Sequence, residues 1–148
     1  MRLTMYTDYS LRVLIYLGLR DREQLSTIQE IADAYQISKN HLMKVTYDLG
    51  QYGFIETIRG RGGGIRLAME PESINIGAVV RKTEEDFHLV ECFNPDNNLC
   101  KISADCRLKG VLAEALKAYL HVLDQYYLSD VLLSKDTMIS LLGIKNSR

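Results

Sequence analysis

The sequence lacks an apolar run that approaches the roughly 20 residues of a membrane-spanning helix, and its first residues lack the charged-then-apolar pattern of a secretory signal peptide. We therefore expect a cytoplasmic protein. Cysteine is scarce, with three residues among 148. An odd number of cysteines in a cytosolic chain argues against a disulfide framework and leaves thiols available for metal binding or redox chemistry. The sequence contains no nucleophile–base pair and no convincing pair of carboxylates, so we do not expect an enzyme.

An excess of charge of one sign is also missing, because the formal net charge is only -1. Domains that bind nucleic acids are often strongly basic, so any DNA site must be a local patch. The rest of the composition, 47% hydrophobic and 25% charged residues, is that of an ordinary soluble protein. A chain of this length can form one domain with a proper core, or a small domain with an oligomerisation element.

The first half of the chain predicts three helices. Thr7 is a candidate cap for the first helix, with Asp8 in its first turn, where the helix dipole favours a carboxylate. Ser26 and Gln29 have the spacing of a capping box for the second helix. Ser38 can cap the third, which Gly53 would end. Two helices joined by a short turn, the later one polar and basic near its start, are typical of a helix-turn-helix.

The start of the third helix carries groups that can reach DNA. A helix fits the major groove of B-DNA, its first-turn amides point at phosphates, and Asn, Lys and His side chains can reach base edges. A solvated helix face is the alternative interpretation. The candidate groups are Ser38, Lys39, Asn40, His41 and Lys44.

The next segment predicts a β-hairpin, with strands at 54–59 and 65–69 joined by a glycine-rich turn. Glycines such as Gly62 and Gly63 let the backbone come close to another surface. Positive charge comes from Arg59, Arg61 and Arg66, and arginine on a narrow hairpin suits phosphates or the minor groove. A phosphate-binding loop is excluded, because no Gly-Lys-Ser/Thr follows and a strand comes next. We therefore expect a winged helix-turn-helix.

All three cysteines lie in the turn-rich segment 92–106, at Cys92, Cys100 and Cys106. Thiolates are soft ligands that suit zinc, copper(I) and iron–sulfur clusters. Three cysteines leave a tetrahedral set one ligand short, so a fourth donor would come from elsewhere in the chain or from a partner subunit. His88 and Glu91 are conceivable donors, although each can equally be a plain surface residue. The alternative is three idle thiols that happen to lie close together.

After the cysteines, residues 107–128 have the longest helical pattern, with two adjacent apolar rows. We expect one row to be buried within the chain and the other in a symmetric homodimer, the alternative being a helix buried in a monomer. The fold class is therefore mainly α with a small β wing: a winged helix-turn-helix plus a long dimerisation helix. The expected division is 1–70 for DNA binding, 71–106 for a connecting helix and the cysteine loop, and 107–148 for the dimerisation helix and tail.

Three segments of the chain, together with three cysteines ahead of a long helix, resemble one bacterial family. The segments are LTMYTDYSLRVLIYL, SKNHLMKVTYDLGQYGFIETIRGRGGGIRLA and INIGAVVRKTE. They are similar to the iron–sulfur winged-helix repressors that include NsrR, IscR and RirA, and most similar to the nitric-oxide-sensing NsrR type. The likeness extends over nearly the whole chain.

The resemblance implies a homodimeric repressor that binds double-stranded operator DNA and carries one iron–sulfur cluster per subunit, held by Cys92, Cys100 and Cys106. The aspartate that serves as fourth ligand in NsrR-like proteins, supplied by the other subunit, matches Asp8 here. IscR-like proteins place a histidine three residues after the third cysteine, where this chain has Lys109, which favours a 4Fe-4S cluster. Nitric oxide is the implied signal. The alternatives are an iron- or redox-responsive repressor of the RirA or IscR kind, an iron–sulfur electron carrier, and a zinc-stabilised or metal-free winged-helix module.

Overall fold

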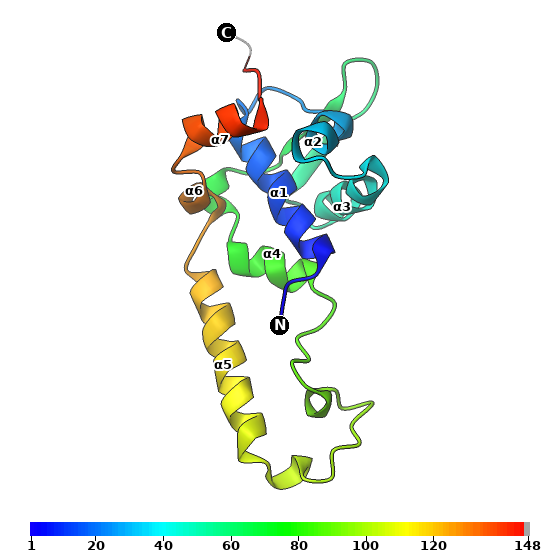
Figure 1. The fold of residues 1–148 in the computed structure, drawn as a ribbon. Helices are drawn as coiled ribbons and strands as arrows, with labels where there is room; N and C mark the ends of the chain where they lie inside the picture. Colours follow the sequence, from blue (N-terminus) through cyan, green and yellow to red (C-terminus); the bar gives the residue numbers. More distant parts are fainter. Residues whose placement is uncertain (147–148) are drawn as a thin grey trace.

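The computed structural model describes residues 1–146, which form seven α-helices and one two-stranded antiparallel sheet (Figure 1). This confirms the predicted fold class, mainly α with a small β wing. The α-helices are α1 (Met5–Leu19), α2 (Ile28–Tyr35), α3 (Lys39–Gln51), α4 (Ile76–Thr83), α5 (Arg107–Asp124), α6 (Leu128–Val131) and α7 (Lys135–Leu142). The strands are β1 (Ile55–Ile58) and β2 (Gly64–Leu67), and short 3-10 helices lie at η1 (Pro71–Ser73), η2 (Glu91–Phe93) and η3 (Ser103–Asp105).

Two of the predicted helix caps are wrong by one turn or less. Thr4, not Thr7, caps α1, because the Thr4 hydroxyl accepts a hydrogen bond from the Thr7 amide. The capping box of α2 is formed by Thr27 and Glu30 instead of Ser26 and Gln29. Ser26 is buried and its backbone pairs with Ile65 of β2, at 2.9 and 2.8 Å. The chain before α2 thus adds a second, short pairing to the wing, on β2, and this pairing moves the start of the helix.

The hydrophobic core lies around α1, which is in contact with α3, α4, β2, α6 and α7. This helix is buried on more than one side, since Val13, Leu14 and Leu19 are fully buried. The end of the chain joins the same core through Leu128, which is fully buried, and Ile144, which is 8% exposed. The first and the last helices therefore share one hydrophobic core.

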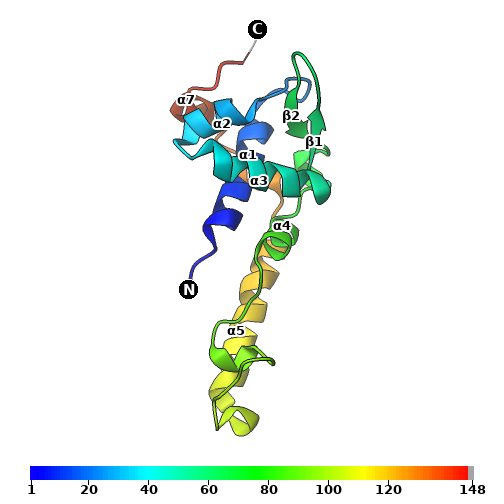
Figure 2. The same cartoon turned by 90° about the vertical axis from the view of Figure 1, so that its right-hand side faces the viewer.

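The long helix α5 projects from this core together with the cysteine loop (Figures 1 and 2). It ends at Asp124, four residues earlier than its apolar pattern predicts, because the chain from Tyr126 to Leu128 pairs with residues 74–76 instead of continuing the helix. None of the residues of α5 is buried. Leu108, Val111 and Val122 are each more than half exposed. Within one subunit, α5 thus leaves several large apolar side chains in solvent.

The connecting helix α4 is capped by Asn75, whose side chain accepts a hydrogen bond from the Ala78 amide at 3.0 Å. None of the helices in residues 1–146 combines the length and the hydrophobicity needed to cross a bilayer. The division of the chain near residues 70 and 106 stays a prediction.

Candidate nucleic-acid interface and cysteine loop

The helices α2 and α3 form the predicted helix-turn-helix. Gln36 turns the chain between them with a φ of 54°, in the left-handed region, and the Ile37 amide donates to Ala32 O at 2.9 Å. Leu42, Val45 and Leu49 then pack α3 into the core. The opposite face of α3 lies in solvent, and it presents all five side chains predicted to bind DNA there: Ser38, Lys39, Asn40, His41 and Lys44.

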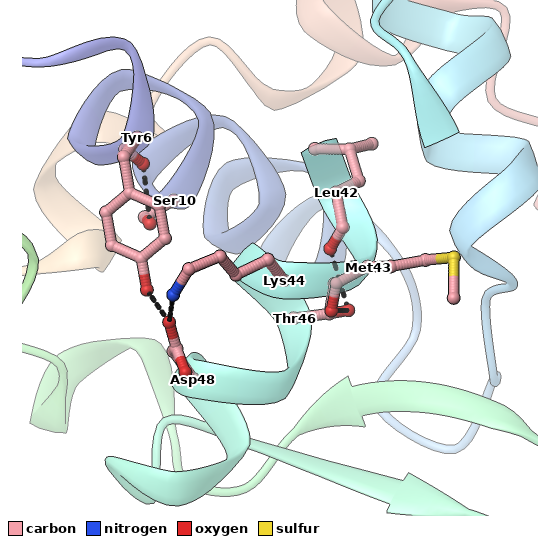
Figure 3. Close-up of polar contacts among 7 residues, drawn as sticks. All are labelled: Tyr6, Ser10, Leu42, Met43, Lys44, Thr46 and Asp48. Carbon is pink, nitrogen blue, oxygen red and sulfur yellow. Dashed lines mark hydrogen bonds and ion pairs between the residues drawn. The ribbon is translucent and has the colours of Figure 1, made fainter. Parts of the chain in front are cut away.

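The outer face of α3 is tied to the start of α1 by a small polar cluster (Figure 3). Asp48 accepts a hydrogen bond from the Tyr6 hydroxyl and another from Lys44 Nζ at 2.9 Å. The Lys44 ammonium also lies 5.3 Å from the centroid of the Tyr6 ring. These contacts hold Lys44 against the protein although its side chain is 74% exposed.

The ionisation of this cluster follows from its contacts. Burial and the hydrogen bond to Asp48 raise the pKa of Tyr6 well above its ordinary value. Hydrogen bonds from Tyr6 and Lys44 lower the pKa of Asp48. Asp48 therefore orients Lys44 on the recognition face. This role was not predicted from the sequence, and the spacing of Lys44 and Asp48, four residues apart on one helix, was the available signal.

A second contact between α1 and α3 is aromatic. The rings of Tyr9 and His41 stack with centroids 6.2 Å apart and planes 28° apart. Together with Met5, Asn40 and Val45 they surround a shallow, largely apolar hollow of about 300 Å³ at the end of the recognition face. His41 is therefore oriented by α1 as well as by its own helix.

The wing pairs β1 with β2 in the register Ile55–Leu67 and Thr57–Ile65. Gly60 and Gly62 have φ values of 100° and 73°, which only glycine adopts easily. At Gly63 a Cβ atom would collide with the carbonyl oxygen of Ile58. The glycine-rich turn is thus a tight reversal that needs its glycines.

The arginines of this hairpin differ in whether they form ion pairs with carboxylates. Arg59 and Arg61 are exposed, and no carboxylate in residues 1–146 forms an ion pair with either. Arg66 is half-buried and pairs with Glu56 at 2.5 Å and with Glu23 at 3.6 Å. The expectation that Arg66 adds positive charge to the wing is therefore corrected, because two carboxylates already offset its charge.

The three cysteines lie on the segment between α4 and α5. Cys92, Cys100 and Cys106 are half-buried and free of disulfides, and Cys106 is the residue just before α5. Side chains of the loop bind its own backbone: Glu91 accepts from the Leu99 amide at 2.6 Å, and Asn98 accepts from the Cys100 amide at 3.1 Å. Glu91 is thereby committed to shaping the loop, and His88 lies 3.6 Å from Asp86.

Residues 1–146 do not form a site for a single metal ion. Within residues 1–146 no three histidine, cysteine, aspartate or glutamate side chains lie close enough to bind one metal ion. The donor set nevertheless suits an iron–sulfur cluster, because three half-buried free thiols on one short loop are the ligands that such clusters use. Their role as ligands stays a prediction.

Asp8, the predicted fourth ligand, has a partner of its own. Its carboxylate accepts from Arg12 Nε at 3.1 Å and lies 2.8 Å from Arg12 Nη2. The hydrogen bond to Asp8 raises the pKa of Arg12. In both views α1 lies in the body of the molecule, whereas the cysteine loop lies beside the far part of α5 (Figures 1 and 2). The structure therefore does not bring Asp8 to the cysteines of its own chain.

Comparison with known proteins identifies the family. A family model described as "Rrf2: Iron-dependent Transcriptional regulator" matches residues 3–134, nearly the whole chain. The chain belongs to the Rrf2 family. It is accordingly a winged-helix transcriptional regulator.

Other Rrf2 proteins share its length and fold. The HTH-type transcriptional regulator NsrR of Bacillus subtilis is 63% identical over 145 residues, 98% of this chain and 99% of the relative. The structure of CymR, described as the global cysteine regulator of B. subtilis, is 27% identical with a TM-score of 0.67, over 88% of this chain and 95% of that one. T. potens IscR, at 23% identity, shares the fold with a TM-score of 0.72, over 89% of this chain and 86% of that one.

Proposed function

We propose that this Rrf2 protein is a cytoplasmic, homodimeric repressor that binds double-stranded operator DNA and releases it in response to nitric oxide through an iron–sulfur cluster. One observation carries the proposal: a single chain joins an exposed recognition helix and an arginine-bearing wing to a separate loop with three free thiols. The 63% identity to a regulator named NsrR supports the same function.

The DNA-binding surface consists of the start of α3 and the tip of the wing. The Ser38 side chain makes no capping hydrogen bond, so its hydroxyl and the first-turn amides of α3 can bind a phosphate. Lys39, Asn40, His41 and Lys44 face the major groove. Arg59 and Arg61 then bind the backbone or the minor groove, because Gly62 and Gly63 let the tip of the wing approach closely.

The dimer forms through α5. A helix of 18 residues without one buried side chain leaves apolar surface that a second copy can cover. Leu108, Val111 and Val122, each more than half exposed, are the first candidates for this contact. In the dimer each subunit presents its own α3, so that two recognition helices reach one operator.

The cluster ligands are Cys92, Cys100 and Cys106, with Asp8 of the partner subunit as the fourth. Lys109, where a histidine would favour a two-iron cluster, points to a 4Fe-4S cluster. Lysine is not a common iron ligand, and Lys109 lies 3.5 Å from the Ser103 hydroxyl. When bound, the cluster supplies iron that can take a small diatomic ligand such as nitric oxide.

Asp8 links the cluster to DNA binding. Its carboxylate pairs with Arg12 in this structure and would leave that pair to act as a ligand. Arg12 lies 5.9 Å from the ring of Tyr9, which stacks on His41 of the recognition face. If Asp8 leaves Arg12, the change can therefore reach α3 through two contacts, Arg12 with Tyr9 and Tyr9 with His41. A coupling of about 1–3 kcal/mol between the two sites would change DNA affinity by about 5- to 150-fold, which is enough for a switch.

The proposal is tested on protein purified without oxygen, by measuring iron, sulfide and the visible spectrum through a nitric-oxide titration. We expect a brown protein with about four irons per chain, which bleaches as nitric oxide is added and loses DNA affinity in parallel. Mutation of any one of the three cysteines to Ala should abolish cluster loading. A cysteine variant that keeps full iron would remove that residue from the ligand set.

Asp8→Ala should load the cluster but lose it faster, whereas Asp136→Ala, which removes a first-turn acid from α7, serves as the matched control. Equal cluster lifetimes would leave Asp8 with only its role in α1. A colourless protein that still binds DNA would indicate a metal-free winged-helix module. Reversible redox cycling without DNA affinity would indicate an electron carrier, and release by iron depletion but not by nitric oxide an iron sensor.

A further inference from the structure

The joint between α4 and α5 is fixed by three hydrogen bonds to one residue. Asp124, the last residue of α5, forms a two-pronged ion pair in which Arg81 Nη1 and Nη2 of α4 each bind one carboxylate oxygen. The backbone carbonyl of Asp124 accepts a further hydrogen bond from Asn75 Nδ2 at 2.7 Å. A bidentate pair of this kind restrains direction as well as distance.

The backbone reinforces the same joint. The Ile76 amide donates to Tyr126 O at 2.9 Å, and the Leu128 amide donates to Ile74 O at 2.8 Å, so that the chain after α5 runs as a short antiparallel bridge beside the start of α4. Gly77 lies directly under the Asp124 carboxylate, where a Cβ atom would collide with Oδ1. A side chain at this position would therefore push the Asp124 carboxylate aside and disturb its ion pair with Arg81.

The other face of α4 is anchored to the DNA-binding body. Val79 and Val80 are fully buried, and α4 packs on α1. At the end of α4, Glu84 accepts hydrogen bonds from the backbone amide and the hydroxyl of Thr4, at 2.8 and 2.9 Å. Thr4 is the residue that caps α1. Since α4 is held by α1 on one side and by Asp124 on the other, the direction of α5 is set relative to the body that carries α3.

From these contacts we infer that Arg81 and Asp124 are positioning residues for operator binding: they fix the direction of α5 and thereby the separation of the two recognition helices. The inference rests on the proposed homodimer through α5. A small change of angle at the joint moves the far end of α5 by a large distance, because 18 residues of helix span about 27 Å. A rotation of about 10° at the joint would move the far end by about 5 Å. Adjacent major grooves on one face of DNA are about 34 Å apart, so such a shift would misplace one half of the dimer.

Changes at the joint should affect the affinity for a full operator site but not the affinity for a single half-site. Binding to a single half-site uses α3 and the wing of one subunit and does not depend on the joint. Binding to a full site gains from the second subunit only if the spacing is correct, because a tethered second contact counts only when the geometry allows both at once. Loosening the joint should therefore weaken full-site binding alone.

The experiment uses a full site selected by the wild-type protein from random DNA duplexes, and a half-site made by scrambling one arm. Asp124→Asn removes the charge of the pair, and Gly77→Ala displaces the carboxylate from the other side. We expect each to raise the full-site Kd at least about fivefold and to leave half-site affinity within about twofold. Glu114→Gln, which removes an exposed charge from the same helix, is the control. The exchange of Arg81→Asp with Asp124→Arg should restore part of the full-site affinity.

Sedimentation of each variant shows whether the dimer itself is kept. The inference is overturned if Asp124→Asn binds the full site as the wild type does, or if full-site and half-site affinities fall together. A wild-type protein that does not distinguish the full site from the half-site would instead contradict the proposed dimeric function, and the inference with it. The ratio of the two affinities thus separates the failure of the joint from the failure of the function.

Discussion

Replacement of Tyr6 by Phe tests whether the polar cluster between α1 and α3 stabilises the recognition helix. The substitution removes one hydroxyl, and with it the hydrogen bond to Asp48. A hydrogen bond to a charged group contributes about 1.5–3 kcal/mol. The Asp48 side chain is 20% exposed and keeps its hydrogen bond from Lys44, so we expect the lower end of this range, a loss of about 1.5 kcal/mol in the free energy of unfolding at pH 7.

The loss should depend on pH with a definite sign. The pKa of Asp48 is lowered by folding, so its contribution is present above the unfolded pKa near 4 and is lost as the pH falls through the folded pKa. The pKa of Tyr6 is raised by folding, so its contribution is present below the unfolded pKa near 10 and is lost at higher pH. The effect of Tyr6→Phe should therefore be largest at neutral pH.

Urea unfolding at fixed protein concentration, followed by circular dichroism at pH 7 and near pH 3.5, gives both values. Tyr47→Phe removes a hydroxyl from a tyrosine that is 67% exposed on the outer face of α3 and should change stability little. The reasoning is refuted if Tyr6→Phe destabilises the protein equally at the two pH values, or if it has no more effect than Tyr47→Phe.

Two further predictions concern the wing. Arg61→Ala should weaken DNA binding for all sequences and reduce the salt dependence of log K by about one unit, whereas Arg66→Ala should do less because Glu56 and Glu23 already offset its charge; equal salt slopes for the two variants in gel-shift titrations would contradict this. Gly63→Ala should open the wing and lower both stability and DNA affinity, because its Cβ would meet Ile58 O. By contrast, Gly110→Ala on α5 has nothing within 4 Å of the new atom and should stabilise the helix by about 0.5–1 kcal/mol in thermal unfolding.

Local patterns predicted most of the fold, and non-local contacts account for the differences. The helix-turn-helix and the wing follow from periodicity and glycines that act within a few residues. The caps of α1 and α2 could not be chosen from the sequence, because Thr4 and Thr27 are as suitable as their neighbours. For α2, the choice of Thr27 over Ser26 is decided by the pairing of Ser26 with Ile65. The early end of α5 has the same origin, since its apolar pattern continues while Tyr126 pairs with Ile76.

The candidate site shows the same division. Which side chains of α3 face solvent is set by the buried stripe of that helix and was predictable. Partners from other segments decide which basic groups are free to bind DNA. Tyr6 holds Asp48, which in turn binds Lys44, and Glu23 pairs with Arg66. The cysteine positions are evident in the sequence. How their sulfurs converge depends on a loop with little packing of its own, and on the group and the partner subunit that it would bind.

The shared core of α1 with the last helices has a consequence for how the protein folds. Leu128 and Ile144 fill the same core as Val13 and Leu14, more than 100 residues earlier in the chain. During synthesis α1 therefore emerges from the ribosome long before these two packing partners exist. Contacts of such high sequence separation are costly to close and slow to form. We expect the recognition helix to become fully stable, and the regulator to acquire its full DNA affinity, only after about residue 144 has been made.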